Sequence, residues 1–167
     1  GFGLTGLWTS TTLVILQFKV LDIVGEENKA SWLGAISVTG LVVAAIVQPI
    51  IGRISDRSRS TMGKRLPFIV VGSGGLLTST ILLGAANTIP LLVAVYSLMQ
   101  LFGNVAQSAA NALLLDHVKD DRRGAAAGAL NLSRSIGGGF FTLLILFLLV
   151  NYDPVTNSIW MWAALAV

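Results

Sequence analysis

The sequence predicts an all-α membrane protein, a bundle of six transmembrane helices, from its composition, its apolar segments and its loops. Hydrophobic residues make up 54% of the chain and charged residues only 11%, whereas ordinary soluble domains contain about 25% charged residues. The apolar residues form segments long enough to cross roughly 30 Å of hydrocarbon, which takes about 20 residues. The basic residues gather in two short loops between these segments. So few charges cannot cover a soluble surface, so we expect the helices to face lipid.

Five segments have the length of a transmembrane helix, and a sixth begins near the end of the chain. They run approximately over residues 2–23, 31–55, 66–87, 90–116 and 124–150, and the sixth starts near 157. Pro90 is expected to open its helix after a short hairpin, and residues 151–156 are expected to form a turn. We treat residues 1–167 as one helical bundle and as a fragment with a truncated sixth helix, because the chain starts without Met and ends in an apolar run. No secretory signal peptide is recognised.

The loops predict the orientation of the helices. Loops 52–65 and 117–123 carry eight Lys and Arg residues, whereas the loops of the other side carry only Lys29. Cytoplasmic loops are enriched in Lys and Arg, so these two loops are expected in the cytoplasm. The predicted location is the plasma membrane or an inner membrane.

Several classes of function are excluded by what the sequence lacks. It has no Cys and a single His, His117, so disulfides, thiolate sites and His-based metal sites are not expected, and no cofactor is predicted. No nucleotide-binding glycine loop occurs, and no nucleophile–base pair points to an enzyme. A net charge of +3 does not predict a nucleic-acid partner, because the basic residues follow the membrane topology.

The loop between the second and third segments carries the most specific pattern. It reads Gly52-Arg53-Ile54-Ser55-Asp56-Arg57, then Gly63-Lys64-Arg65 and Pro67-Phe68. A second pattern, Asn104-x-x-Gln107, continues to Ala112-Leu113-Leu114-x-Asp116, and a third, Arg122-Arg123-Gly124, opens the fifth segment. Together these patterns resemble the amino-terminal six-helix half of a major facilitator superfamily transporter. The long spacer closed by Pro-Phe is similar to the sucrose transporters and to the glycoside–pentoside–hexuronide symporters.

The resemblance implies a conformational latch at the cytoplasmic side of the membrane. Its expected members are Gly52, Asp56, Arg57, Gly63, Lys64, Arg65 and Asp116. In the family, the acid at the position of Asp56 meets the positive N-terminus of a helix in the second half. Arg57 is expected to reach an acid on a neighbouring helix, with Asp116 as the candidate. Alternatively, these charges are only solvated anchors that fix the topology.

Two departures from the related branches limit what the resemblance implies. Melibiose-type symporters carry acidic cation ligands in the second helix where this chain has Ala44 and Gln48, so a sodium site of that kind is not expected. Sucrose transporters carry a basic residue at the position of Asn111, so their sugar and proton chemistry does not transfer intact.

Polar residues inside the apolar segments predict a substrate cavity. Gln100, Asn104, Gln107 and Asn111 share one helical face by their spacing, and Thr5, Trp8 and Thr12 form a similar stripe. Arg134 lies ten or so residues into the fifth segment, roughly 15 Å from the cytoplasmic end at 1.5 Å per residue. The expected lining of the cavity is Trp8, Thr12, Asn104, Gln107, Asn111, Asn131 and Arg134. The alternatives are hydrogen bonds between helices for the amide stripe and a structural role for Arg134.

These observations lead to a secondary active or facilitative transporter of small polar solutes, with sugars or glycosides as the expected substrates, working by alternating access. The expected partners are the solute, the lipid bilayer and a carboxy-terminal six-helix half, and a coupling proton or cation is left open. Two alternatives remain: a transporter-like factor in membrane assembly or pigment binding, and an exporter of amphipathic compounds.

Overall fold

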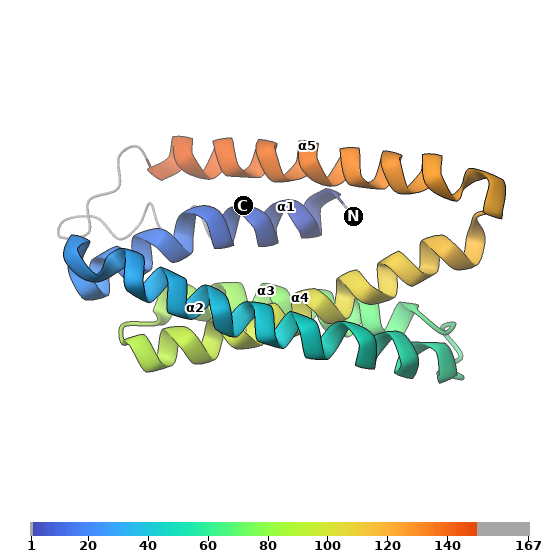
Figure 1. Cartoon of the computed structure of the whole chain (residues 1–167), viewed down its shortest axis with the longest axis horizontal. Helices are drawn as coiled ribbons and strands as arrows, with labels where there is room; N and C mark the ends of the chain where they lie inside the picture. The colour runs from blue at the N-terminus through green and yellow to red at the C-terminus, as the bar shows by residue number, and fades with distance from the viewer. Residues whose placement is uncertain (1, 150–167) are drawn as a thin grey trace.

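The computed structural model describes residues 2–149, and these residues form helices joined by short connections (Figure 1). The elements in chain order are α1 (Phe2–Ser10), the π-helical turn η1 (Thr11–Ile15), α2 (Leu16–Arg57), α3 (Leu66–Ala85), α4 (Ile89–His117), the 3₁₀ turn η2 (Asp120–Arg122) and α5 (Arg123–Leu149). The described part of the chain contains no strand, and the predicted all-α bundle is confirmed. The turn predicted at 151–156 and the sixth segment lie outside the described residues.

Four helical stretches of the described residues are long and apolar enough to cross a membrane, and the first of them is long enough to cross it twice. Gly3–Arg57 has 55 residues, which at 1.5 Å per residue would be about 80 Å long if straight, far more than one bilayer requires. The stretch turns at Gly25, where φ is 72° and ψ is 175°. Only glycine adopts this backbone conformation without strain. We therefore call residues 2–24 helix 1 and residues 26–57 helix 2.

The predicted boundaries differ from the structure at this turn. The sequence predicted a connection of several residues between 23 and 31, whereas helix 2 starts directly after Gly25. Glutamate is a good helix former, and the pair Glu26–Lys29, with 4.0 Å between its charged atoms, lies one helical turn apart. Polar residues outside the membrane can continue a helix as readily as apolar ones inside it, and hydropathy does not detect them.

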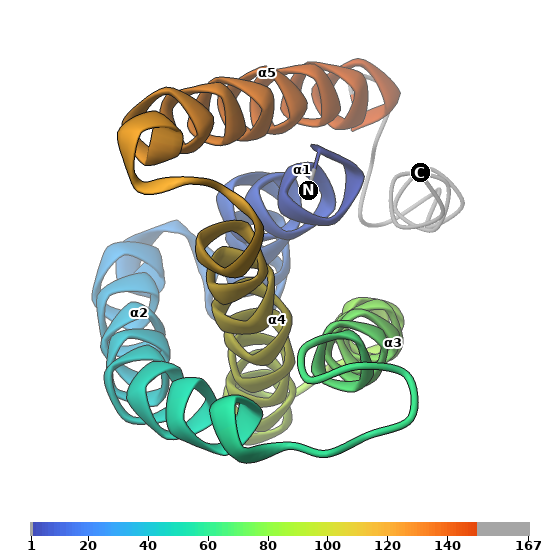
Figure 2. The same cartoon turned by 90° about the vertical axis from the view of Figure 1, so that its right-hand side faces the viewer.

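The helices pack around α4 and helix 1. Viewed along the bundle, α4 lies between α2 and α3, and helix 1 separates α4 from α5 (Figure 2). Glycines allow the close approach of α3 to α4: a Cβ atom added at Gly72 would lie 2.6 Å from the backbone nitrogen of Ala106. Without a hydrophobic force between helices in lipid, such close backbone contacts hold membrane bundles together.

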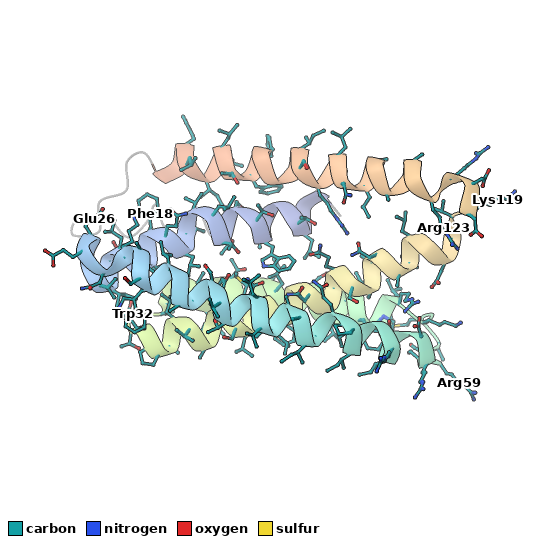
Figure 3. All side chains as sticks on the ribbon, viewed as in Figure 1. Phe18, Glu26, Trp32, Arg59, Lys119 and Arg123 are labelled. Atoms are coloured by element: carbon teal, nitrogen blue, oxygen red, sulfur yellow. The ribbon has the colours of Figure 1, made fainter. Side chains whose placement is uncertain are left out.

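Exposure follows the pattern of a membrane protein. Along helix 2 an exposed apolar stripe recurs about every four residues; it consists of Val38, Leu41, Val42, Ile46, Ile50 and Ile54. In water such a face would be unfavourable, whereas lipid tails, which are as apolar as these side chains, can cover it. Charged residues gather at the ends of the bundle, with Glu26 at one end and Arg59, Lys119 and Arg123 at the other (Figure 3), and Arg134 is an exception inside it.

A buried lysine links helix 1 to the α3–α4 connection at the end of the bundle that carries Glu26. Lys19 is only 5% exposed, and its Nζ donates to the carbonyl oxygen of Gly84 at 3.1 Å and to Oδ1 of Asn87 at 3.5 Å. Gly84 lies in the last turn of α3, where carbonyl groups lack helical partners and the helix dipole favours a cation. Lys19 therefore fastens helix 1 to the α3–α4 hairpin.

Candidate functional site

An ion cluster ties together three helix ends at the basic end of the bundle. Arg65 directly precedes α3, and its side chain is only 7% exposed. Its Nη2 donates to Oδ1 of Asp56 at the end of α2, and its Nε donates to Oδ2 of Asp116 at the end of α4, at 3.0 Å. Its Nη1 donates to the hydroxyl of Ser55. One planar guanidinium thus holds the ends of α2 and α4 against the start of α3.

The expected partner of Asp116 was Arg57, and in the structure Arg65 takes this place. Arg57 is exposed on the last turn of α2. The chain turns back between them through Gly63, whose φ of 94° requires glycine, and this turn carries Arg65 inward. The hydrogen bond from Arg65 lowers the pKa of Asp116, and the nearby charges of Arg65, Lys64 and His117 add to this effect against the opposing effect of burial.

The remaining residues of the predicted latch lie around this cluster. Lys64 is exposed. A Cβ atom at Gly52 would meet nothing within 4 Å in the described part of the chain. No other helix of residues 2–149 therefore approaches Gly52 closely.

A first pocket lies between helix 1 and α4, and we call it the Trp8 pocket. It has a volume of about 320 Å³. Its lining consists of Thr5, Trp8, Thr9, Thr12, Leu13, Gln100 and Gln107. The ring of Trp8 packs on α4 at Gly103, where an added Cβ would lie 2.9 Å from Cε2 of the ring. Glycine thus makes room for a flat aromatic surface, with amide groups from α4 beside it.

A second pocket lies between helix 1 and α5, and we call it the Arg134 pocket. It has a volume of about 500 Å³. Its lining consists of Thr5, Thr9, Leu13, Arg134, Ser135, Gly138, Gly139, Thr142 and Leu143. Thr5, Thr9 and Leu13 belong to both pockets. The two pockets are therefore neighbours on either side of one stretch of helix 1.

Helix 1 is irregular beside these pockets. The π-helical turn η1 begins at Thr11, and the N–H of Leu16 bonds the carbonyl of Thr11, five residues back. The hydroxyl of Thr12 donates to the carbonyl oxygen of Trp8 at 2.9 Å. Single π-helical turns occur mostly where a helix serves a functional site, because they shift the register of the side chains.

The amide stripe on α4 does not serve a single cavity. Gln107 lines the Trp8 pocket. Asn104 is only 1% exposed; it accepts from Nε2 of Gln48 at 2.7 Å and donates to the carbonyl of Gln100. Asn111 accepts from Nη2 of Arg134 at 2.6 Å. The stripe therefore supplies two groups that line the Trp8 pocket, Gln100 and Gln107, one link to helix 2 and one hydrogen-bond partner for Arg134.

The two α5 residues of the predicted cavity, Arg134 and Asn131, lie in different surroundings. Arg134 lines the pocket named after it, whereas Asn131 is exposed. Sequence analysis missed the hydroxyl groups of Ser135 and Thr142 in this pocket, although their spacing of seven places them on one helical face. It also missed Thr9, which lies four residues after Thr5 and carries the helix 1 stripe into both pockets.

Apolar helices long enough to cross a membrane, with pockets between them that carry hydroxyl, amide and guanidinium groups, define a multi-pass membrane protein of the solute-carrier type. The chain belongs to the Major Facilitator Superfamily, whose family profile matches residues 1–167. The predicted membership of this superfamily is confirmed.

Two relatives agree with the predicted branch. The sucrose transport protein SUC4 of Arabidopsis thaliana is 28% identical over 131 residues, which covers 69% of this chain and 24% of that protein. An uncharacterized symporter of Synechocystis sp. is 36% identical over 83 residues, which covers 49% of this chain and 14% of that protein. The matches thus span a quarter or less of these relatives. No solved structure matches the chain significantly.

Proposed function

We propose that residues 1–167 form the amino-terminal six-helix half of a transporter that moves small polar solutes, sugars or glycosides, by alternating access. The observation that carries this proposal is the pair of neighbouring pockets on either side of helix 1, lined by hydroxyl, amide and guanidinium groups. Polar groups inside a membrane bundle usually face a substrate path. Membership of the Major Facilitator Superfamily supports transport, and the relation to a sucrose transport protein supports a sugar.

We assign roles to the pocket residues by their contacts. Trp8 offers its ring as a surface for the apolar face of a sugar, and Gln107 offers an amide to its hydroxyl groups. Arg134 and Asn111 act as a pair in the Arg134 pocket. Thr12 stabilises helix 1 beside the pocket through its hydrogen bond to the carbonyl of Trp8. Asn104 links α4 to helix 2 through Gln48. Asn131 would contact the second half.

We propose that the ion cluster is the latch of this transporter. Arg65, Asp56 and Asp116 form its centre, and Gly52, Arg57, Gly63 and Lys64 are its periphery. The side chain of Asp56 is 62% exposed although it accepts from Arg65. Its carboxylate is therefore accessible to a carboxy-terminal half, where the positive end of a helix dipole at a helix N-terminus would attract the negative charge.

The proposed setting is the plasma membrane or an inner membrane, with loops 52–65 and 117–123 in the cytoplasm. The partners are the solute, the bilayer and the carboxy-terminal half of the same protein. Within residues 2–149, neither pocket is lined by an Asp or Glu. If transport is coupled to a proton or cation, we expect the coupling carboxylate in the second half.

Uptake of labelled sugars by the full-length protein in proteoliposomes tests this function. Trp8→Leu should weaken sugar binding roughly two- to tenfold, the value of 0.5–1.5 kcal/mol for an aromatic contact. Trp32→Leu is the matched control, because Trp32 is 40% exposed near the other end of the bundle from the ion cluster (Figure 3). Absence of uptake for every sugar tested, or equal effects of the two substitutions, would contradict the proposal.

A further inference from the structure

A buried tyrosine contacts the wall of the Trp8 pocket. Tyr96 is 2% exposed and does not line that pocket, whereas Gln100, one helical turn further along α4, does. Nε2 of Gln100 donates to the hydroxyl oxygen of Tyr96 at 2.6 Å. The two side chains meet because residues four apart are neighbours on the surface of a helix. The NH2 end of this amide is therefore bonded to a residue that a solute in the pocket does not reach.

Helix 2 packs against the same two side chains through a buried glycine, Gly40. A Cβ atom added at Gly40 would lie 2.8 Å from Nε2 of Gln100 and 2.9 Å from Cε1 of Tyr96. The backbone of helix 2 therefore leaves the amide no free space on this side. An amide that is hydrogen-bonded and packed in this way has lost most of its rotamers before a solute arrives, which reduces the entropy cost of binding.

The oxygen of the Gln100 amide is the end that remains for a solute. Within residues 2–149, Oε1 makes no hydrogen bond, and it is not one of the unpartnered side-chain atoms that are shielded from solvent. An amide oxygen accepts and cannot donate, so it selects a group that donates. Gln107 lines the same pocket without a hydrogen bond to any described residue, so its amide can turn either end to the solute. Of the two amides, only that of Gln100 is fixed.

We infer that Tyr96 is a positioning residue for solute recognition: it holds Gln100 so that Oε1 accepts a hydrogen bond from one hydroxyl group of the solute. The Trp8 pocket then offers a fixed acceptor beside a flat aromatic ring. A solute without a donor at the matching position leaves this acceptor unpaired, so the pocket distinguishes sugars by the place of a hydroxyl group. The inference rests on the proposed function and adds to it a residue outside the pocket that sets specificity.

Sugar analogues test which end of the amide faces the solute. Dissociation constants of the purified full-length protein are measured for glucose and galactose and for their monodeoxy and monodeoxyfluoro derivatives, in which hydrogen or fluorine replaces one hydroxyl group. Neither substituent donates a hydrogen bond, so at one position both derivatives should bind roughly two- to tenfold more weakly than the parent sugar. Gln100→Leu should remove this preference, and Gln100→Glu should keep it, because a carboxyl group also accepts. Loss of the preference in Gln100→Glu would show that the NH2 end faces the solute and would overturn the inference.

A double-mutant cycle tests the role of Tyr96. Tyr96→Phe keeps the ring and removes the hydroxyl that holds the amide, so it should reduce the preference for the parent sugar several-fold. In a protein that already carries Gln100→Leu, Tyr96→Phe should not weaken binding further, because a positioning residue acts only through the residue it holds. Gly40→Ala reaches the same amide from helix 2 and should also reduce the preference, because Nε2 at the end of a flexible side chain has to shift. The test therefore does not depend on the folding of one variant.

The control and the outcomes separate this inference from the proposed function. Gln48→Leu removes a hydrogen bond of the same kind between helix 2 and α4, and Gln48 lines neither pocket. It should lower the melting temperature and leave the preference for the parent sugar unchanged. Additive effects of Tyr96→Phe and Gln100→Leu would mean that Tyr96 only packs α4 against helix 2, which would overturn the inference and leave sugar transport standing. Failure of every sugar to bind would instead overturn the proposed function, and the inference with it.

Discussion

At the scale of single residues, Asp116 provides a test of the ion cluster through its pKa. Asp116→Asn removes the charge that accepts from Arg65 at 3.0 Å. The side chain of Asp116 is 43% exposed, so we expect a loss of about 1 kcal/mol in the free energy of unfolding at neutral pH. The folded-state pKa lies below the ordinary value of 3.8. The contribution of Asp116 is therefore fully present above about pH 4–5 and is lost as pH falls through the folded-state pKa.

The measurement is thermal unfolding of the full-length protein and the variant over a range of pH. The difference between them should be constant at neutral pH and should shrink in acid. Asp121→Asn serves as the control, because Asp121 and Arg122 are 3.9 Å apart and are 71% and 81% exposed. A difference that grows on acidification, or an equal effect of both substitutions, would rule out a stabilising pair between Arg65 and Asp116.

The ion cluster also shows which contacts a sequence motif can predict and which it cannot. The loop motif predicted a latch of acidic and basic residues, with Arg57 as the partner of Asp116. It did not predict which arginine is buried, because Arg57 and Arg65 both lie in loop 52–65 and the sequence does not fix the path of this loop. The turn at Gly63 decides this, and a positive φ cannot be inferred from charge spacing. Likewise, spacing placed Asn104 and Gln107 on one face, but the bond from Gln48 to Asn104 depends on how helix 2 crosses α4.

At the scale of helices, two neighbouring glycines of α3 separate packing from helix propensity. Gly72→Ala should destabilise the protein by about 1–3 kcal/mol, as expected for overpacking. A Cβ atom there would lie 2.6 Å from the backbone nitrogen of Ala106 and 2.8 Å from the carbonyl oxygen of Phe102. These are backbone atoms of α4, which cannot move aside as a side chain can.

Gly74→Ala is the matched control, because Gly74 lies on the same helix and a Cβ atom added there would meet no atom of another residue within 4 Å. Alanine favours a helix over glycine by about 1 kcal/mol, so this variant should be neutral or slightly more stable. Thermal unfolding of both variants in detergent is the measurement. Equal melting temperatures would show that α3 and α4 do not approach each other this closely.

Helix existence was predicted well, and helix ends less well. Apolar length alone identified α3, α4 and α5 within a few residues of their bounds, because the bilayer sets the length of a crossing. The turn between helices 1 and 2 was predicted too long, since Glu26 and Lys29 are polar and also helical. The π-helical turn η1 has no signature in hydropathy at all.

At the scale of the whole molecule, the bundle leaves much of α5 uncovered. Leu132, Ile136, Phe140, Leu143 and Phe147 are each more than half exposed. They recur every three or four residues along one helix, so they form a continuous apolar face. Lipid or the proposed carboxy-terminal half would cover it.

The last prediction concerns the latch in the full-length transporter. Asp56→Asn keeps the size of the side chain but removes the negative charge that accepts from Arg65 and faces outward at the end of α2. We expect a slower transport rate, because the latch stabilises one state of the cycle, and a bias of about 1.4 kcal/mol changes the ratio of two states tenfold. The equilibrium affinity for solute should stay within a few-fold, since Asp56 lines neither pocket. Uptake rates and dissociation constants on the same preparation, with Asp121→Asn as the control for an acidic residue at the same end of the bundle, provide the measurement. Complete loss of solute binding in a folded Asp56→Asn protein would contradict the latch, because a residue that only sets the balance of states cannot abolish the site itself.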